Sequence, residues 1–147
     1  MTPAAPSRAD RLGPYTVLTL TLVFVGGGAG TFIRYLAENL NPAQTDEFPW
    51  GTMLANVTGA LGLGLLTGYL MVAKAPPFVQ PLVATGFFGA FTTFSTFAVE
   101  VAQRLRDSLI ELALLYAAAT LVLGLTAAFI GYHLGRRLTP PQQESPS

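Results

Sequence analysis

Four long apolar runs, separated by short polar or proline-containing segments, dominate the pattern of this 147-residue chain. A helix needs about 20 apolar residues to cross the hydrocarbon of a bilayer, and each run reaches that length. The runs extend from about Tyr15 to Leu36, Trp50 to Val72, Phe78 to Ala102 and Leu109 to Leu134. The pattern predicts an all-α integral membrane protein whose four transmembrane helices form one domain over residues 14–138.

The two ends of the chain have a different composition. Residues 1–13 and 139–147 are rich in Pro, Ser and other polar residues, which predicts disordered tails. Arg8 and Arg11 precede the first apolar run as they would in a signal peptide. However, that run is too long for a signal peptide and continues into a glycine cluster, so we interpret it as a retained helix.

Composition supports a membrane protein and excludes several classes of site. Only 11% of the residues are charged, against about 25% in an ordinary globular domain. The eight basic and eight acidic residues cancel, so the chain has no electrostatic reason to bind nucleic acid. It has no cysteine, and its one histidine, His133, has no cluster of carboxylates around it for a metal site. We therefore expect His133 to have an interfacial or packing role.

The basic residues outside the runs give only a weak signal for orientation. An even number of spans puts both termini on one side, with five basic residues there: Arg8, Arg11, Lys74, Arg136 and Arg137. The other side has three, namely Arg34, Arg104 and Arg106. By the positive-inside rule this favours cytoplasmic termini mildly, and it permits insertion in both orientations.

Small residues form faces on several of the predicted helices. Gly26 with Gly30, Gly64 with Gly68, and Gly131 with Gly135 are each spaced four residues apart. Because apolar side chains gain little by leaving lipid for protein, membrane helices associate through close backbone approach at such residues. Four short helices offer little interior of their own, so we expect an oligomer.

Polar side chains inside the runs need partners. Asn56 lies a few residues into the second run, one turn after Thr52, and Tyr116 lies about two turns into the fourth. An unpaired amide in hydrocarbon costs several kcal/mol. The residues alone leave two interpretations of Asn56, an interhelical hydrogen bond or a functional group.

The third run has an unusual pattern of aromatic and hydroxyl residues between positions 86 and 97. Phenylalanines recur every three residues, and four hydroxyls lie among them within five residues, Thr92, Thr93, Ser95 and Thr96. Ser and Thr side chains can bond freed backbone groups, so the segment can break a helix at membrane depth where protein or water covers it. Exposed carbonyls could then hold a cation, and the positive edges of phenyl rings could face an anion. A kinked helix with lipid-facing phenylalanines is the alternative.

Arg34, near the end of the first run, is open to three interpretations. It can extend its charge to the membrane interface, pair with Glu38 at i+4, or attract anions to a pore mouth.

At these residues the sequence resembles the small Fluc/CrcB-type fluoride channels, over nearly the whole chain. The first run has GGAGTFIRY at 27–35, similar to the family's glycine-rich start that ends in arginine. The second has GTMLANVTG at 51–59, and the third has GFFGAFTTFSTF at 86–97, which is the most specific of the three. The main departure is Ala55, where the family often has valine.

The resemblance implies passive fluoride efflux across the inner (cytoplasmic) membrane by an antiparallel, dual-topology homodimer, which would confer fluoride resistance. It implies a third helix broken at mid-membrane and a structural sodium ion at the dimer centre, held by the backbone carbonyls of Gly89 and Thr92. Side chains from both subunits would line each fluoride pathway: Asn56, Phe94, Ser95, Thr96, Phe97, Tyr116, Thr52 and Thr120, with Arg34 at the mouth.

Two other functions remain alternatives to a channel. A small multidrug or proton-coupled exporter would use a membrane-embedded carboxylate, and Glu100, late in the third run, is the nearest candidate. A non-transporting assembly subunit would have the same size and hydropathy. An enzyme is the least favoured class, because no nucleophile–base pair or metal cluster is visible.

Overall fold

The chain folds into helices arranged as four long segments. The computed structural model describes residues 14–40, 42–73 and 75–138, and there is no β-strand among them. The elements are α1 (Pro14–Leu40), α2 (Trp50–Leu70), η1 (Gln80–Phe88), α3 (Gly89–Phe91), α4 (Phe94–Arg106) and α5 (Ile110–Arg137). Four segments are long and apolar enough to cross a membrane, as the sequence predicts, and the third consists of η1, α3 and α4.

Some helices extend beyond the apolar runs. α1 continues to Leu40 because Arg34 pairs with Glu38 at 3.2 Å and the Asn39 amide donates to the Tyr35 carbonyl at 2.7 Å. α5 continues to Arg137, where two arginines in the last turn favour the helix C-terminus. The tails expected at 1–13 and 139–147 lie outside the described residues.

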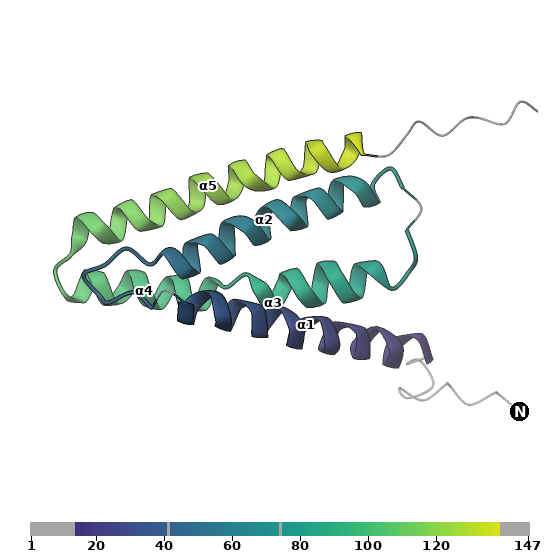
Figure 1. Ribbon diagram of the computed structural model, residues 1–147, viewed down its shortest axis with the longest axis horizontal. Helices are drawn as coiled ribbons and strands as arrows, with labels where there is room; N and C mark the ends of the chain where they lie inside the picture. The colour runs from purple at the N-terminus through teal and green to yellow at the C-terminus, as the bar shows by residue number, and fades with distance from the viewer. Residues whose placement is uncertain (1–13, 41, 74, 139–147) are drawn as a thin grey trace, which may run out of the picture.

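The segments pack as two pairs (Figure 1). α2 lies along α5, and α1 lies along η1 and α3, while α4 contacts the first part of α5. The α1–α2 loop and the α4–α5 turn meet at one end of the bundle, which we call the loop end. The start of α1 and the end of α5 lie at the opposite end, as an even number of spans requires.

Glycines set the close approach of α2 and α5. A β-carbon on Gly64 would overlap the carbonyl oxygen of Ala128, and one on Gly131 would overlap that of Leu61. Gly68 and Gly135 make equivalent approaches one turn further along the two helices. The glycine faces predicted from sequence are therefore true backbone contacts, which provide the van der Waals packing that holds helices together in lipid.

The α1–η1 pair is built in the same way. A β-carbon on Gly26 would overlap the carbonyl oxygen of Leu82, and one on Gly30 would overlap that of Phe87. η1 is wound as a π-helix, so the amide of Gly89 reaches back five residues to the carbonyl of Ala84. This winding, which the apolar pattern does not predict, is a feature often found near functional sites.

Few side chains are enclosed within one chain. The buried apolar residues of the described part include Pro49, Met53, Ala55, Ala113, Tyr116 and Ala127, and several of them are small. Large apolar side chains instead cover the outside of α1 and α5. Lipid or another protein surface therefore covers most of the apolar area of the molecule.

Candidate functional site

Two residues with extended backbone separate α3 from α4. α3 ends at Phe91, Thr92 has φ −78° and ψ 152°, Thr93 has φ −144° and ψ 123°, and α4 begins at Phe94. Thr93 is the N-cap of α4, because its Oγ1 accepts a hydrogen bond from the Thr96 amide at 3.2 Å. A hydroxyl of the sequence-predicted cluster thus bonds one of the amides that the start of a helix leaves free.

Asn56 on α2 holds this interruption in place. Its Oδ1 accepts from the Thr93 amide at 2.7 Å, and its Nδ2 donates to the Thr93 carbonyl at 3.0 Å. One side chain therefore satisfies both backbone polar groups of a residue that belongs to no helix. Gly59, close by on α2, makes room, since a β-carbon there would come within 2.5 Å of the Thr92 methyl. Of the two interpretations of Asn56 that the sequence allowed, the interhelical hydrogen bond is therefore present.

The same bonds leave two carbonyls without their usual helical donors. In a continuous α-helix the amide of residue i bonds the carbonyl of residue i−4. Here the Thr93 amide points to Asn56 instead of Gly89, and the Thr96 amide points to Thr93 Oγ1 instead of Thr92. Gly89 is exposed on the surface of the chain. The carbonyls of Gly89 and Thr92 are thus among those that the interruption frees from α-helical bonding, and that of Ala90 accepts from Arg34 Nε instead.

The four hydroxyls of the segment separate into two groups. Thr93 Oγ1 lies 3.2 Å from Ser95 Oγ and 3.2 Å from Thr96 Oγ1, which makes a small network at the start of α4. The hydroxyl of Thr92 instead donates back to the Phe88 carbonyl at 3.0 Å and caps the end of α3. Ser95 is exposed, so the network opens to the outside of the single chain.

A groove of about 350 Å³ lies beside the interruption. Its lining includes Asn56, Thr93, Phe94, Phe97 and Thr120, in addition to apolar residues of α2 and α5. Phe94 is 79% exposed in the single chain, and its ring centre lies 5.9 Å from that of Phe97. Among the described residues, the buried hydroxyl of Thr120 has no hydrogen-bond partner. The groove therefore offers phenyl rings and neutral polar groups, one of them unpaired.

A second polar cluster lies one turn further along α4. Thr52 donates to Glu100 Oε1 at 2.8 Å, and Tyr116 donates to Glu100 Oε2 at 2.7 Å. Tyr116 is fully buried, and its ring centre lies 5.2 Å from that of Phe97. The structure therefore provides the partner that the Tyr116 hydroxyl was expected to need, and Phe97 connects this cluster to the groove.

Sequence reasoning did not connect Glu100 with Thr52 and Tyr116. The available signal was its spacing, because Glu100 follows Thr96 by four residues and Phe97 by three on α4. Residues at these spacings share one helix face. From the sequence, we interpreted Glu100 only as a candidate carboxylate for an exporter.

Arg34 binds within its own chain and lies away from the groove. It forms the ion pair with Glu38, as one of the three interpretations predicts, and its Nε donates to the Ala90 carbonyl at 3.2 Å. This second bond attaches the end of α1 to α3. His133 packs against the ring of Phe129, with centres 4.3 Å apart, which agrees with a packing role.

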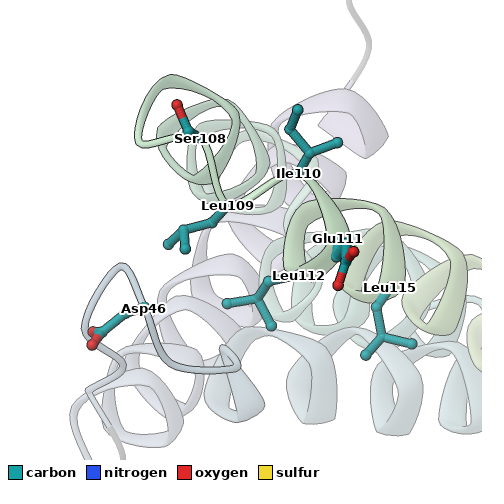
Figure 2. Close-up of a pocket in the computed structure, with 7 residues that line it drawn as sticks. All are labelled: Asp46, Ser108, Leu109, Ile110, Glu111, Leu112 and Leu115. Carbon is teal, nitrogen blue, oxygen red and sulfur yellow. The ribbon is translucent and has the colours of Figure 1, made fainter.

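A larger hollow than this groove lies elsewhere, at the loop end (Figure 2). It measures about 680 Å³ and lies between the α1–α2 loop, which carries Asp46, and the first turns of α5. Leucines make up much of its lining, and none of the sequence-predicted pathway residues takes part. No group of three or more His, Cys, Asp or Glu side chains that could hold a metal occurs in the described part of the chain. The groove beside Thr93 is therefore the candidate site.

Replacing Asn56 by alanine should destabilise the protein, because the Thr93 amide and carbonyl would lose their partners inside the membrane. A buried polar group left unpaired costs about 1–3 kcal/mol. The measurement is the thermal unfolding midpoint in detergent. Thr58→Ala is the matched control on α2, since that hydroxyl only bonds carbonyls of its own helix. Equal midpoints for the two variants would contradict the role of Asn56.

Comparison with known proteins places the chain in a family. Residues 21–132 match the family model described as CrcB-like protein, Camphor Resistance (CrcB). Fluoride-specific ion channel FluC 2 of Bacillus subtilis (strain 168) is 43% identical over 122 residues, which cover 82% of this chain and 90% of that protein. Fluoride-specific ion channel FluC of Novosphingobium aromaticivorans is 38% identical over 117 residues, covering 78% and 93%. Fluoride-specific ion channel FluC 1 of Staphylococcus aureus (strain NCTC 8325 / PS 47) is 40% identical over 119 residues, covering 80% and 96%. The family match reaches into all four spans, so the chain belongs to the CrcB-like protein family and is a multi-pass protein of the cell membrane.

Proposed function

We propose that this protein is a fluoride-selective channel that lets fluoride leave the cytoplasm passively and so protects the cell. Relatives at 43% and 38% identity carry the name fluoride-specific ion channel, and they match this chain over most of their length. Those names describe channels and not enzymes. The groove beside Thr93 supports the same function on physical grounds.

The observation that carries the proposal is the grouping of Phe94, Phe97, Asn56 and Thr120 around one groove that contains no formal charge. Fluoride is small and strongly hydrated, so its lost water must be replaced by donors. Phenyl edges and neutral donors supply positive potential without a fixed cation. An ion held in this way can still leave, and conduction requires binding that is weak enough for exit.

The proposed path continues from the groove to the loop end. Phe97 connects the groove with the hydroxyls of Tyr116 and Thr52, both of which donate to Glu100. An anion can take a hydrogen bond from these hydroxyls only where Glu100 releases them. Ser95 and Thr96 lie at the exposed start of α4, where the pathway of a single chain is open on one side.

Fluoride flux through liposomes tests the function. Wild-type protein should release fluoride down its gradient under an electrical shunt, and chloride far more slowly. Phe94→Ile should lower fluoride flux by roughly tenfold or more, because an aliphatic side chain has no positive ring edge. Phe129→Ile is the matched control, since Phe129 is a similarly exposed ring on α5 outside the groove.

Three results would contradict this function. Equal release of chloride would refute the selectivity, and no release by the wild type would favour an assembly subunit. Loss of transport in Glu100→Gln with full flux in Phe94→Ile would favour the exporter. The geometry gives the exporter little support, because both Glu100 oxygens already accept bonds from neutral hydroxyls.

We also propose that two copies assemble as an antiparallel, dual-topology homodimer. A single chain leaves Phe94 79% exposed and the groove open along one side, so another surface is needed to enclose an ion. By sequence, the membrane side with the termini carries five basic residues, Lys74 included, and the other side carries three, a difference small enough for insertion in both orientations. A second copy of this chain supplies a matching groove without any further partner.

Labelling of a single cysteine tests the dual topology. The chain has no cysteine, so Ser108→Cys in the exposed α4–α5 turn provides one site. A membrane-impermeant maleimide added to intact cells should label about half of the copies, because the weak basic bias lets the chain insert either way. The rest should react only after permeabilisation. Labelling of all copies, or of none, before permeabilisation would exclude dual topology.

We further propose that a sodium ion binds where the interrupted segments of the two copies meet, in the break that lies at mid-membrane. The residues present fit such an ion. Neither Gly89 nor Thr92 has its carbonyl bonded by the amide four residues later, and carbonyl oxygens can replace the water around an alkali cation. A bound sodium ion would supply fixed positive charge that holds the two copies together.

Removal of sodium should weaken the dimer. When N-methyl-D-glucamine replaces Na⁺ throughout purification, the thermal midpoint of the dimer should fall, since carbonyls lose the cation that they share. Returning Na⁺ should restore the midpoint, whereas equal ionic strength of N-methyl-D-glucamine should not. An unchanged midpoint and dimer fraction without sodium would remove this part of the proposal.

A further inference from the structure

Arg104 is a buried cation near the loop end that the proposed pathway does not use. Its side chain is only 2% exposed, although it lies in the last turn of α4. Its NH1 donates to the Glu100 carbonyl at 3.0 Å, and its NH2 donates to the carbonyls of Gln44, at 3.2 Å, and Glu47. The guanidinium also lies 5.8 Å from the centre of the Tyr116 ring. It therefore connects α4 with the α1–α2 loop and with α5.

No carboxylate in the described part of the chain lies within 4.0 Å of Arg104. Within residues 14–40, 42–73 and 75–138, the ion pair within 4.0 Å is that of Arg34 with Glu38. The Glu47 carboxylate instead accepts from the Gln44 amide, and its main-chain oxygen faces Arg104. The buried Nε of Arg104 has no hydrogen-bond partner among these residues. A buried cation held only by carbonyl dipoles is costly, and ionisable groups kept inside membrane proteins are generally functional.

Tyr116 contacts both this cation and the carboxylate of Glu100. Its hydroxyl donates to Glu100, and its ring lies over the Arg104 guanidinium. Glu38 and Glu100 both line a small polar cavity of about 30 Å³ beside Thr52. Arg34 neutralises the charge of Glu38 by direct pairing. The Glu100 carboxylate, which lies on the proposed path, accepts bonds only from the neutral hydroxyls of Thr52 and Tyr116.

An anion that approaches Tyr116 would be repelled by Glu100. Charges interact over longer distances inside the membrane than in water, because the surroundings screen them less. Arg104 is four residues beyond Glu100 on α4, and its charge opposes that of Glu100 at the Tyr116 ring. The titratable residues that contact Arg104 are Glu100 from its own helix, Tyr116 from α5 and the loop residue Glu47, the last through its main-chain carbonyl.

We propose that Arg104 is a positioning residue for anion conduction, whose buried charge offsets that of Glu100 and lets an anion reach the hydroxyl of Tyr116. Its bonds to the α1–α2 loop keep that charge beneath the ring. This inference rests on the proposed fluoride channel function. It goes further by assigning a specific electrostatic task to a residue outside the phenylalanine groove.

Two substitutions separate the charge of Arg104 from its bonds to the loop. Arg104→Gln keeps amide donors for the loop carbonyls and removes the charge, whereas Arg104→Lys keeps the charge and removes the planar fork. The readout is fluoride efflux from liposomes over a range of fluoride concentrations, with the fraction of folded dimer measured for each variant. Arg106→Gln is the control, because Arg106 is an exposed arginine in the same helix turn.

The charge role predicts that Arg104→Gln raises the half-saturating fluoride concentration roughly tenfold, whereas Arg104→Lys and Arg106→Gln stay within about threefold of wild type. A purely structural role would lower the number of active channels and leave half-saturation unchanged. Wild-type half-saturation in Arg104→Gln would overturn the inference. A tenfold rise of the half-saturating fluoride concentration in Arg104→Lys would also overturn it, because that variant keeps the charge. The Lys variant therefore tests the inference even if Arg104→Gln does not fold. Absence of fluoride flux in the wild type would instead overturn the channel function itself.

Discussion

The hydrogen bonds between the Asn56 amide and the backbone of Thr93 are the interaction on which the rest of the site depends. In hydrocarbon an amide and a carbonyl outside a helix need partners from the protein, because no water is available. Asn56 supplies both partners from a neighbouring helix. The bonds let α3 end and α4 begin within two residues, and they turn Phe94 and Phe97 toward one groove. They also direct the Thr93 amide away from Gly89.

Close helix packing makes this bond possible. Asn56 can reach Thr93 only if α2 lies at a fixed distance and register from the interruption, and Gly59 permits the approach at Thr92. Gly64 and Gly131 hold α2 against α5, while Gly26 and Gly30 hold α1 against η1. Because these contacts are between backbones, they leave little freedom for either pair to slide or rotate.

The charged side chains near the proposed path lie toward the loop end and not in the groove. The lining of the groove beside Thr93 has no charged side chain, whereas the paired or buried charges of Arg34, Glu38, Glu100 and Arg104 lie toward the loop end. There Arg34 pairs directly with Glu38, and Tyr116 contacts both the Arg104 guanidinium and the Glu100 carboxylate. A neutral interior and a charge-balanced approach suit an ion that must both enter and leave.

The sequence alone determined the features that depend on local pattern: four spans from the length of apolar runs, packing faces from glycine spacing, and the hydroxyl cluster that caps α4. It also carried the family resemblance, because those motifs are contiguous. Tertiary structure decided which distant side chains meet. Glu100 lies 48 residues from Thr52 and 16 from Tyr116, and Arg104 bonds loop carbonyls 57 and 60 residues away. Such contacts depend on how each helix is rotated about its axis, and that rotation is set by the packing of all the helices together.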